Sequence, residues 1–271
     1  MRNKKMSEQK IMVYCGFHES DYYAIAHGIR ISEIFQLQLC LFHSLETTAL
    51  KSDAQLRLSA MIKRVKLTNP DISIASLCLK GTLADTIGRV TDGFDGIMMI
   101  CSTMDLKFKV KALQQSRIPF LFVGKWEEDF LNYKHIILPM DYRKVMKSSA
   151  LWGTYFARFN QSNIELLSAN EKDGENKRKL ELNVQAFEKI MNGFGLKYKR
   201  TQAVKSSFTL PKEALVKAKK QKSDLLIIPA SQKVTLIDLW IGLPEMRLIK
   251  QAEGVPIMCI NPTHDMLVLC D

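Results

Sequence analysis

The stretch Gly96-Ile-Met-Met-Ile100 is apolar throughout, and Leu225-Leu-Ile-Ile228 repeats it, with Ile228 lying 128 positions after Ile100. Short runs without a polar residue are typical of strands that are covered on both faces, as the inner strands of a parallel sheet are. Each run follows a segment with the apolar spacing of an amphipathic helix. The two runs therefore predict two parallel α/β units in one chain.

Outward from these runs, strands and helices alternate in both halves of the sequence. In the first half, strands are expected at 11–15, 37–42, 72–77, 96–100 and 118–123. In the second half, they are expected at 136–140, 164–167, 198–204, 225–228 and 255–260. This alternation predicts, in each half, a doubly wound five-stranded parallel sheet between helices, a Rossmann-like α/β/α sandwich with right-handed crossovers.

The length and composition agree with two folded domains. The chain has 271 residues, of which 46% are hydrophobic and 25% charged, and these are ordinary values for globular proteins. We expect one domain at 10–125 and a second at 134–262, joined by a polar and aromatic stretch. The tail at 263–271 contains Met266-Leu-Val-Leu-Cys270, a candidate for an additional edge strand.

The formal net charge of +11 favours anionic partners. The basic residues are spread along the chain and no nucleic-acid motif accompanies them, so we expect no nucleic-acid partner. None of the six cysteines forms a C-x-x-C pair, and five of them lie in apolar stretches, which is typical of reduced, buried thiols. No apolar run approaches the roughly 20 residues that cross a bilayer. We therefore expect a cytoplasmic protein with no membrane partner.

The order and spacing of three motifs resemble the universal stress protein family in its tandem form. The segment Ile136-Ile-Leu-Pro-Met-Asp-Tyr-Arg143 is similar to the opening I-L-V-P-V-D-x-S of that family. Ser223-Asp-Leu-Leu-Ile-Ile228 is similar to A-D-L-I-V-M, and Val255-Pro-Ile-Met-Cys-Ile260 to C-P-V-L-V-V. The resemblance covers both halves, and it implies a nucleotide-binding-type fold that pairs through its fifth strands.

The resemblance also implies a site. Many members of the family bind ATP with G-x-x-G-x9-G-[ST] after the fourth strand, because glycines let backbone amides approach phosphates. Here the matching positions are Pro229, Gln232, Gly242 and Leu243, and only Gly242 agrees. Pro229 has no N–H to donate. We expect this phosphate loop to be degraded.

The base-binding end of the second half agrees better with the family. Asp141 matches the acid that faces the adenine, and Ala169 matches a small residue that contacts the base. The candidate ligand-binding residues are Pro139, Met140, Asp141, Ala169, Pro229, Gln232, Gly242 and Leu243. In the first half Gly16 replaces the acid, and nine fewer residues separate the fourth and fifth strands. We expect that first site to be lost.

Several of these residues have a structural interpretation as well. Asp141 is also a good helix N-cap, and Gly242 before a proline is also ordinary turn chemistry. Arg143 and Lys233 are either anion ligands or solvated side chains. The apolar segment 234–241 is either a partner surface or packed core. The five histidines have no metal-ligand spacing, so we expect no metal site.

The sequence contains no G-x-S-x-G elbow, no Walker loop and no H-E-x-x-H pair, so no enzyme activity is expected. The first hypothesis is a regulatory or interaction protein of stress response with little or no ATP binding. We expect 118–123 and 255–260 to pair within the chain and so form a pseudo-dimer. The partners would be another protein or a second copy of the chain. The alternative is a sensor that binds ATP or AMP in the second domain alone. A nucleotide hydrolase is a third class.

Overall fold

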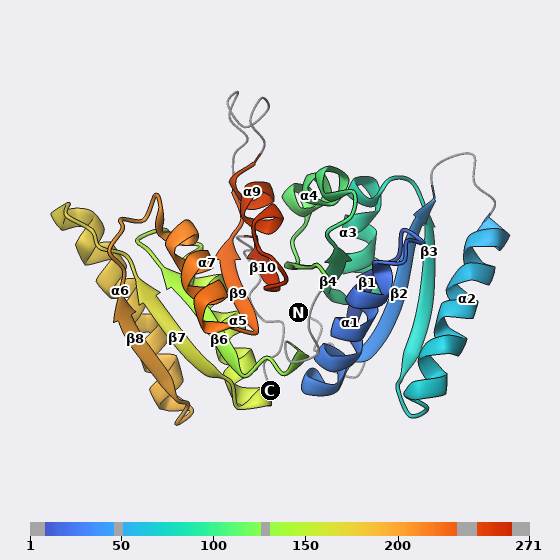
Figure 1. Cartoon of the computed structure of the whole chain (residues 1–271), viewed down its shortest axis with the longest axis horizontal. Coiled ribbons are helices and arrows are strands. Elements are labelled where there is room, and N and C mark those ends of the chain that lie inside the picture. The colour runs from blue at the N-terminus through green and yellow to red at the C-terminus, as the bar shows by residue number, and fades with distance from the viewer. Residues whose placement is uncertain (1–8, 46–50, 126–130, 232–242, 262–271) are drawn as a thin grey trace. The chain divides into compact units, whose positions relative to one another are not determined.

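The computed structural model describes residues 9–45, 51–125, 131–231 and 243–261 (Figure 1). The chain forms two compact units, and the boundary between them lies at Lys125 and Trp126. Gln232 and Gly242 of the candidate site lie outside the described residues, as do Lys233, the segment 234–241 and the tail 263–271.

The first unit is a five-stranded parallel sheet with the strand order β3-β2-β1-β4-β5. Its strands are β1 (Lys10–Tyr14), β2 (Gln38–Leu45), β3 (Ile74–Lys80), β4 (Gly96–Ser102) and β5 (Phe120–Val123). Its helices are α1 (Asp21–Phe35), α2 (Lys51–Thr68), α3 (Leu83–Phe94) and α4 (Leu106–Gln115).

The second unit repeats this plan with the order β8-β7-β6-β9-β10, again parallel throughout. Its strands are β6 (His135–Met140), β7 (Asn163–Ser168), β8 (Tyr198–Gln202), β9 (Leu225–Pro229) and β10 (Ile257–Ile260). Its described helices are α5 (Met146–Asn160), α6 (Gly174–Gly193), α7 (Leu210–Gln221) and α9 (Pro244–Lys250).

The predicted fold class is confirmed. Every residue of β4 and β9, the two runs that led to the prediction, is buried. The ten expected strands all form, with ends shifted by a few residues. The predicted pairing of 118–123 with 255–260 concerns the placement of one unit against the other, and it stays a prediction. Among the helices that the structure describes, none has the length and apolar character needed to cross a membrane.

One pair of glycines shows how closely the two units repeat. Gly28 of α1 and Gly153 of α5 lie 125 positions apart, and each faces the first strand of its own unit. A Cβ atom on Gly28 would lie 2.5 Å from Val13 Cγ2, and one on Gly153 would lie 3.4 Å from Leu138 Cδ2. Val13 and Leu138 are themselves 125 positions apart. A glycine at this position lets the helix after the first strand pack tightly on the sheet.

The strand order also locates the ligand-binding side of each unit. In the second unit, the chain runs from β6 outward through β7 to β8 and then returns to add β9 and β10 on the other side of β6. In open parallel sheets, ligands bind outside the carboxyl ends of the strands at the point where the order reverses. That point lies between β6 and β9, and its counterpart in the first unit lies between β1 and β4.

Candidate functional site

The structure brings most of the described candidate residues to the carboxyl edge of the second sheet. Pro139 and Met140 are the last two residues of β6, and both are buried. The amide of Ala169, which directly follows β7, donates to the carbonyl of Met140 at 2.9 Å. Extending the β6–β9 register from Ile137 and Leu226 places Pro229 level with Met140. Leu243 is the residue before α9.

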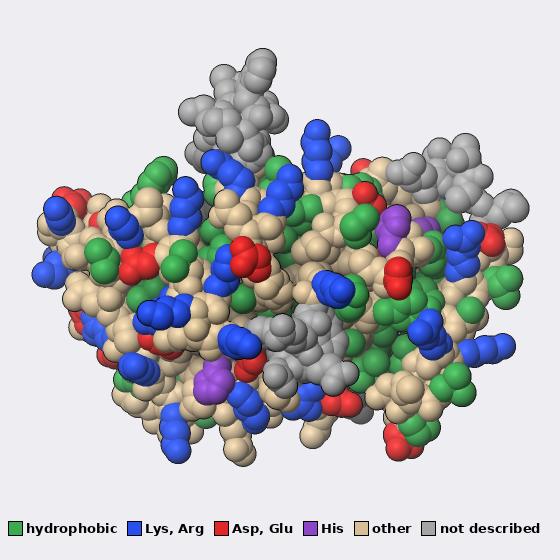
Figure 2. Space-filling model, viewed as in Figure 1, with side chains coloured by type: hydrophobic (Ala, Val, Ile, Leu, Met, Phe, Trp, Pro, Cys, Tyr) green, Lys and Arg blue, Asp and Glu red, His purple; other side chains and the backbone are tan. Residues whose placement is uncertain are grey.

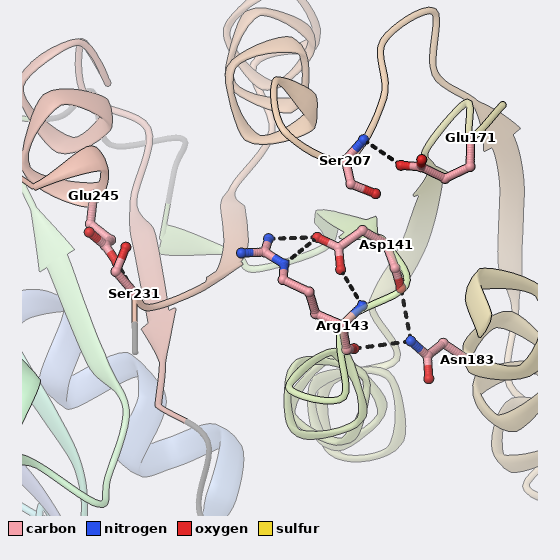
Figure 3. A network of polar contacts seen from close by, with 7 residues as sticks. All are labelled: Asp141, Arg143, Glu171, Asn183, Ser207, Ser231 and Glu245. Atoms are coloured by element: carbon pink, nitrogen blue, oxygen red, sulfur yellow. Dashed lines mark hydrogen bonds and ion pairs between the residues drawn. The ribbon is translucent and has the colours of Figure 1, made fainter. Parts of the chain in front are cut away.

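The carboxylate of Asp141 is hydrogen-bonded to Arg143 within the same turn (Figure 3). Only 1% of it is exposed, and Oδ1 accepts the backbone N–H of Arg143 at 2.8 Å. Oδ2 accepts Nε of Arg143 at 2.9 Å and Nη2 at 2.5 Å. Asn183 of α6 donates to the carbonyls of Asp141 and Arg143 at 2.8 and 3.0 Å, which fixes the turn from the other side. Both carboxylate oxygens of Asp141 are therefore engaged within the protein.

The helix N-cap interpretation of Asp141 is wrong in detail. Helix α5 begins at Met146, and Val145 occupies the N-cap position without a side-chain hydrogen bond. Asp141 instead forms a turn with the amide two residues ahead, an arrangement in which a short acid replaces a backbone acceptor. Its basic partner Arg143 is 43% exposed at the side chain, so the guanidinium reaches the surface at the mouth of the crevice.

Three further carboxylates bind loop amides at this edge of the second unit. Glu171, which follows β7, accepts the amide of Ser207 at 2.7 Å. Glu213 of α7 accepts the amides of Val204 and Lys205, both at 2.8 Å. Glu245 of α9 accepts the amide of Ser231, just past β9 (Figure 3). With Asp141, these residues form a set that we call the amide-binding carboxylates.

For Glu171 and Glu245, no local pattern in the sequence predicts the amide that each one binds. The acceptor and donor are 36 positions apart for Glu171 and 14 apart for Glu245, and only the fold brings them together. Acidic residues in the first turn of a helix, such as Glu213 and Glu245, are favourable near the positive end of the helix dipole in any case. Their additional role on the loops is visible only in three dimensions.

The corresponding edge of the first unit contains a buried charged network. Lys109 of α4 is 1% exposed, and its Nζ donates to the carbonyl and to Oγ of Ser102, both at 2.9 Å. The hydroxyl of Ser102 donates to Oδ1 of Asp21 at 3.2 Å. Oδ2 of Asp21 accepts the amide of His18 at 3.0 Å. The ammonium and the carboxylate are thus joined through one serine at the end of β4.

Aromatic rings fill the space beside this network. The ring centroids of Phe17 and His43 are 4.3 Å apart, and those of Tyr14 and His43, which are stacked, are 6.3 Å apart. Nδ1 of His43 lies 2.6 Å from the carbonyl oxygen of Cys15. Burial lowers the pKa of His43 and raises the pKa of Tyr14 to about 12, so both side chains are neutral at pH 7.

The cysteines of the first unit are poorly suited to redox chemistry. Cys15 and Cys101 are fully buried free thiols at the ends of neighbouring strands. Burial raises the pKa of Cys15 well above its usual value and that of Cys101 to about 12, which suppresses the reactive thiolate. Within the described ranges, no three His, Cys, Asp or Glu side chains are grouped so that they could hold a metal ion.

Comparison with solved structures identifies the fold as that of the universal stress proteins. A universal stress protein from Archaeoglobus fulgidus DSM 4304 matches with a TM-score of 0.72 at 10% identity, over 94% of this chain and 98% of that one. A functionally unknown protein from Pseudomonas aeruginosa PAO1 gives 0.60 at 13% identity, over 97% and 96%. The cytoplasmic domain of a prokaryotic cation chloride cotransporter gives 0.61 at 10% identity, over 96% and 98%.

These matches extend over both units, so the chain has the two-domain layout of the universal stress fold. No protein-family model and no curated protein sequence matches the chain. At identities of 10–13% the likeness defines the fold, while any activity has to be argued from the site itself.

Proposed function

We propose that this protein is a regulatory or interaction protein of the universal stress type, acting in the cytoplasm, whose two crevices bind little or no ATP. The observation that carries the proposal is the set of amide-binding carboxylates. In an anion site, loop amides at the carboxyl edge of the sheet point at the ligand. Here amides after β6, β8 and β9 donate to Asp141, Glu171, Glu213 and Glu245.

The charges around the crevice of the second unit also disfavour the binding of ATP. A triphosphate would approach an edge that already holds four carboxylates. Among the residues that the structure describes, only Asp141 of these four forms an ion pair, with Arg143. Pro229 and Pro244 both lack an N–H where a phosphate would need donors. In the first unit, Lys109, Asp21 and the aromatic rings occupy the equivalent edge with their own side chains. No catalytic role is part of this proposal.

One loop of the second unit is a suitable docking element. Between β8 and α7, Val204 and Phe208 are 77% and 94% exposed, although neighbouring amides of the same loop are fixed by Glu213 and Glu171. A large apolar side chain on an ordered loop loses little further entropy on binding. Exposed aromatic anchors of this kind dominate many protein interfaces. We assign the partner contact to this loop.

The charge of the second unit favours an acidic protein as the partner. Residues 131–231 contain 19 lysines and arginines against nine aspartates and glutamates. Figure 2 shows the basic side chains scattered over the visible face of this unit, without the continuous stripe that nucleic acid requires. The same fold serves as the cytoplasmic domain of a cation chloride cotransporter, so a role within a larger assembly is compatible with it.

Affinity capture from a lysate of the source cells tests this proposal, with the wild type and the double variant V204S/F208S as baits. We expect the wild type to retain a defined acidic protein that the double variant loses, because the two apolar anchors are gone. A variant with Leu56→Ser, at another exposed apolar position, 70% exposed and in the first unit, is the matched control. Equal capture by all three baits would contradict the assignment of the loop.

An adenine-nucleotide sensor that uses the second unit alone is the second candidate. Its support is the adjacency of Asp141 and Ala169 at the ends of neighbouring strands, joined through the hydrogen bond to Met140. Reading a base with Asp141 requires Arg143 to release the carboxylate. The sensor hypothesis therefore predicts that R143A strengthens binding of ATP or AMP, whereas D141A abolishes it.

A further inference from the structure

Among the amide-binding carboxylates, Asp141 and Glu245 lie at the point where the strand order reverses, and Glu245 is the one that binds an amide after β9. The amide of Ala230 donates to Ile260 at 2.8 Å and so belongs to the sheet. The next amide, that of Ser231, is the first one beyond the sheet at the carboxyl end of β9, and it donates to Oε1 of Glu245. Figure 3 shows the carboxylate of Glu245 directed towards Ser231.

The carboxylate of Glu245 is buried and incompletely paired. The residue is 4% exposed, and Oε2 has no hydrogen-bond partner in the described part of the chain. Burial raises the pKa of Cys259 in β10, and the nearby charge of Glu245 raises it further. A buried carboxylate with one unsatisfied oxygen is costly, and its persistence at this position calls for a role.

An amide beyond the carboxyl end of a strand, at the reversal point of a parallel sheet, is where an anionic ligand would be bound. A carboxylate makes the same charge-assisted hydrogen bond to that amide as a phosphate oxygen does. An incoming anion would have to displace Glu245 and would meet its charge in a poorly solvated place, where like charges repel strongly.

We infer that Glu245 is the specificity-determining residue of the second crevice, an internal anion that occupies the amide of Ser231 and excludes phosphate-bearing ligands. This inference rests on the proposed function, since it names the residue that makes the crevice reject nucleotides. Removal of the carboxylate leaves an amide donor free at the reversal point, with Arg143 as the basic group at the same edge. The ligand class that such a vacated position takes is a phosphate or diphosphate group.

The test is a calorimetric titration of four full-length proteins with ATP and with inorganic pyrophosphate. They are the wild type, E245A, E245Q and E213A. The control E213A loses the same charge and also frees loop amides, those of Val204 and Lys205, but at β8, away from the reversal point. Circular dichroism and a cooperative thermal transition establish that each variant is folded.

We expect E245A to bind both probes at least tenfold more tightly than the wild type and E213A do. E245Q, whose amide oxygen still accepts the Ser231 N–H without the charge, is expected to fall between E245A and the wild type. A folded E245A that binds no better than the wild type, or a gain that E213A shares, overturns the inference. If E245A does not fold, E245Q decides in its place, and affinity equal to that of the wild type overturns the inference.

The wild-type titration keeps the two claims separate. Micromolar binding of ATP by the wild type would contradict the proposed function itself. Absence of binding by the wild type together with absence of a gain in the Glu245 variants would leave the proposed function intact and remove only the role of Glu245.

Discussion

Several acidic side chains in the second unit bind backbone amides. Asp224, from the segment that resembles the family motif before the fourth strand, accepts the amides of Lys134 and His135 at 2.6 and 2.8 Å. Burial raises its pKa in spite of these bonds. Its position before β9 therefore has a structural reason, because it ties the start of β6 to the start of β9. The amide-binding carboxylates do the same for the loops at the opposite edge of the sheet.

Some residues of the candidate site were predictable from the sequence, and others were not. Asp141 and Ala169 are implied by the resemblance to the universal stress protein family, and the structure places both at the carboxyl edge. Arg143 was considered only as an anion ligand or a solvated side chain, and its bond to Asp141 was missed. The buried Lys109 was missed as well, since its partner Ser102 is recognisable only once α4 is packed on β4.

His27 makes stability depend on pH. It is fully buried in α1, and burial lowers its pKa to about 3 from the usual 6.5. Between these values the unfolded chain binds a proton that the folded chain refuses, so acid favours unfolding. We expect the unfolding free energy to fall by about 1.4 kcal/mol for each pH unit between 6 and 4 because of this residue.

The variant H27Q removes the titrating group and retains a polar side chain. Denaturant unfolding of both proteins at pH 4, 5 and 6 measures the difference, because the carboxylates contribute equally to both. Parallel dependence of the two proteins on pH would show that His27 is protonated in the folded state.

At the scale of the elements, the fold was predictable because the runs 96–100 and 225–228, which form most of β4 and β9, are apolar throughout. The remaining differences between the expected and the observed strands lie at the strand ends, where polar contacts determine which residues belong to the sheet. The strand expected at 198–204 ends at Gln202, because the amide of Val204 donates to Glu213 and leaves the sheet. The strand expected at 118–123 begins at Phe120, because the amide of Ile118 donates to Oγ of Ser116.

The tight contact of α1 with β1 gives a prediction at this scale. In G28A the new methyl group would press on Val13, whose branched side chain in a strand cannot move far, and overpacking of this kind costs about 1–3 kcal/mol. The equivalent substitution G153A meets Leu138 only at 3.4 Å and should cost less. Thermal unfolding of the three proteins should place G28A well below both the wild type and G153A.

The control is G88A, at an exposed helical position of α3 where a Cβ would meet nothing within 4 Å. It should stabilise the protein by about 0.5–1 kcal/mol, since alanine restricts the unfolded chain more than glycine does. Equal stability of G28A and G88A would mean that α1 lies further from the sheet than the structure has it.

At the scale of the whole molecule, one fold occurs twice, and in each copy the chain's own side chains bind polar groups at the edge where a ligand is expected. The first unit uses a buried lysine, an aspartate and aromatic rings, and the second uses carboxylates on loop amides. Because the two units fill the same edge of the sheet with different side chains, we propose surface contacts, and not ligand binding, as their common function. The exposed apolar side chains of the loop between β8 and α7 are where we expect those contacts.

The most direct test of this account is a calorimetric titration of the purified wild-type protein with ATP and AMP, combined with native mass spectrometry of the protein as isolated. We predict the mass of the bare chain and no heat of binding at micromolar to millimolar ligand. A co-purifying nucleotide, or saturable binding with a micromolar Kd, would contradict the account and make the second unit a nucleotide sensor.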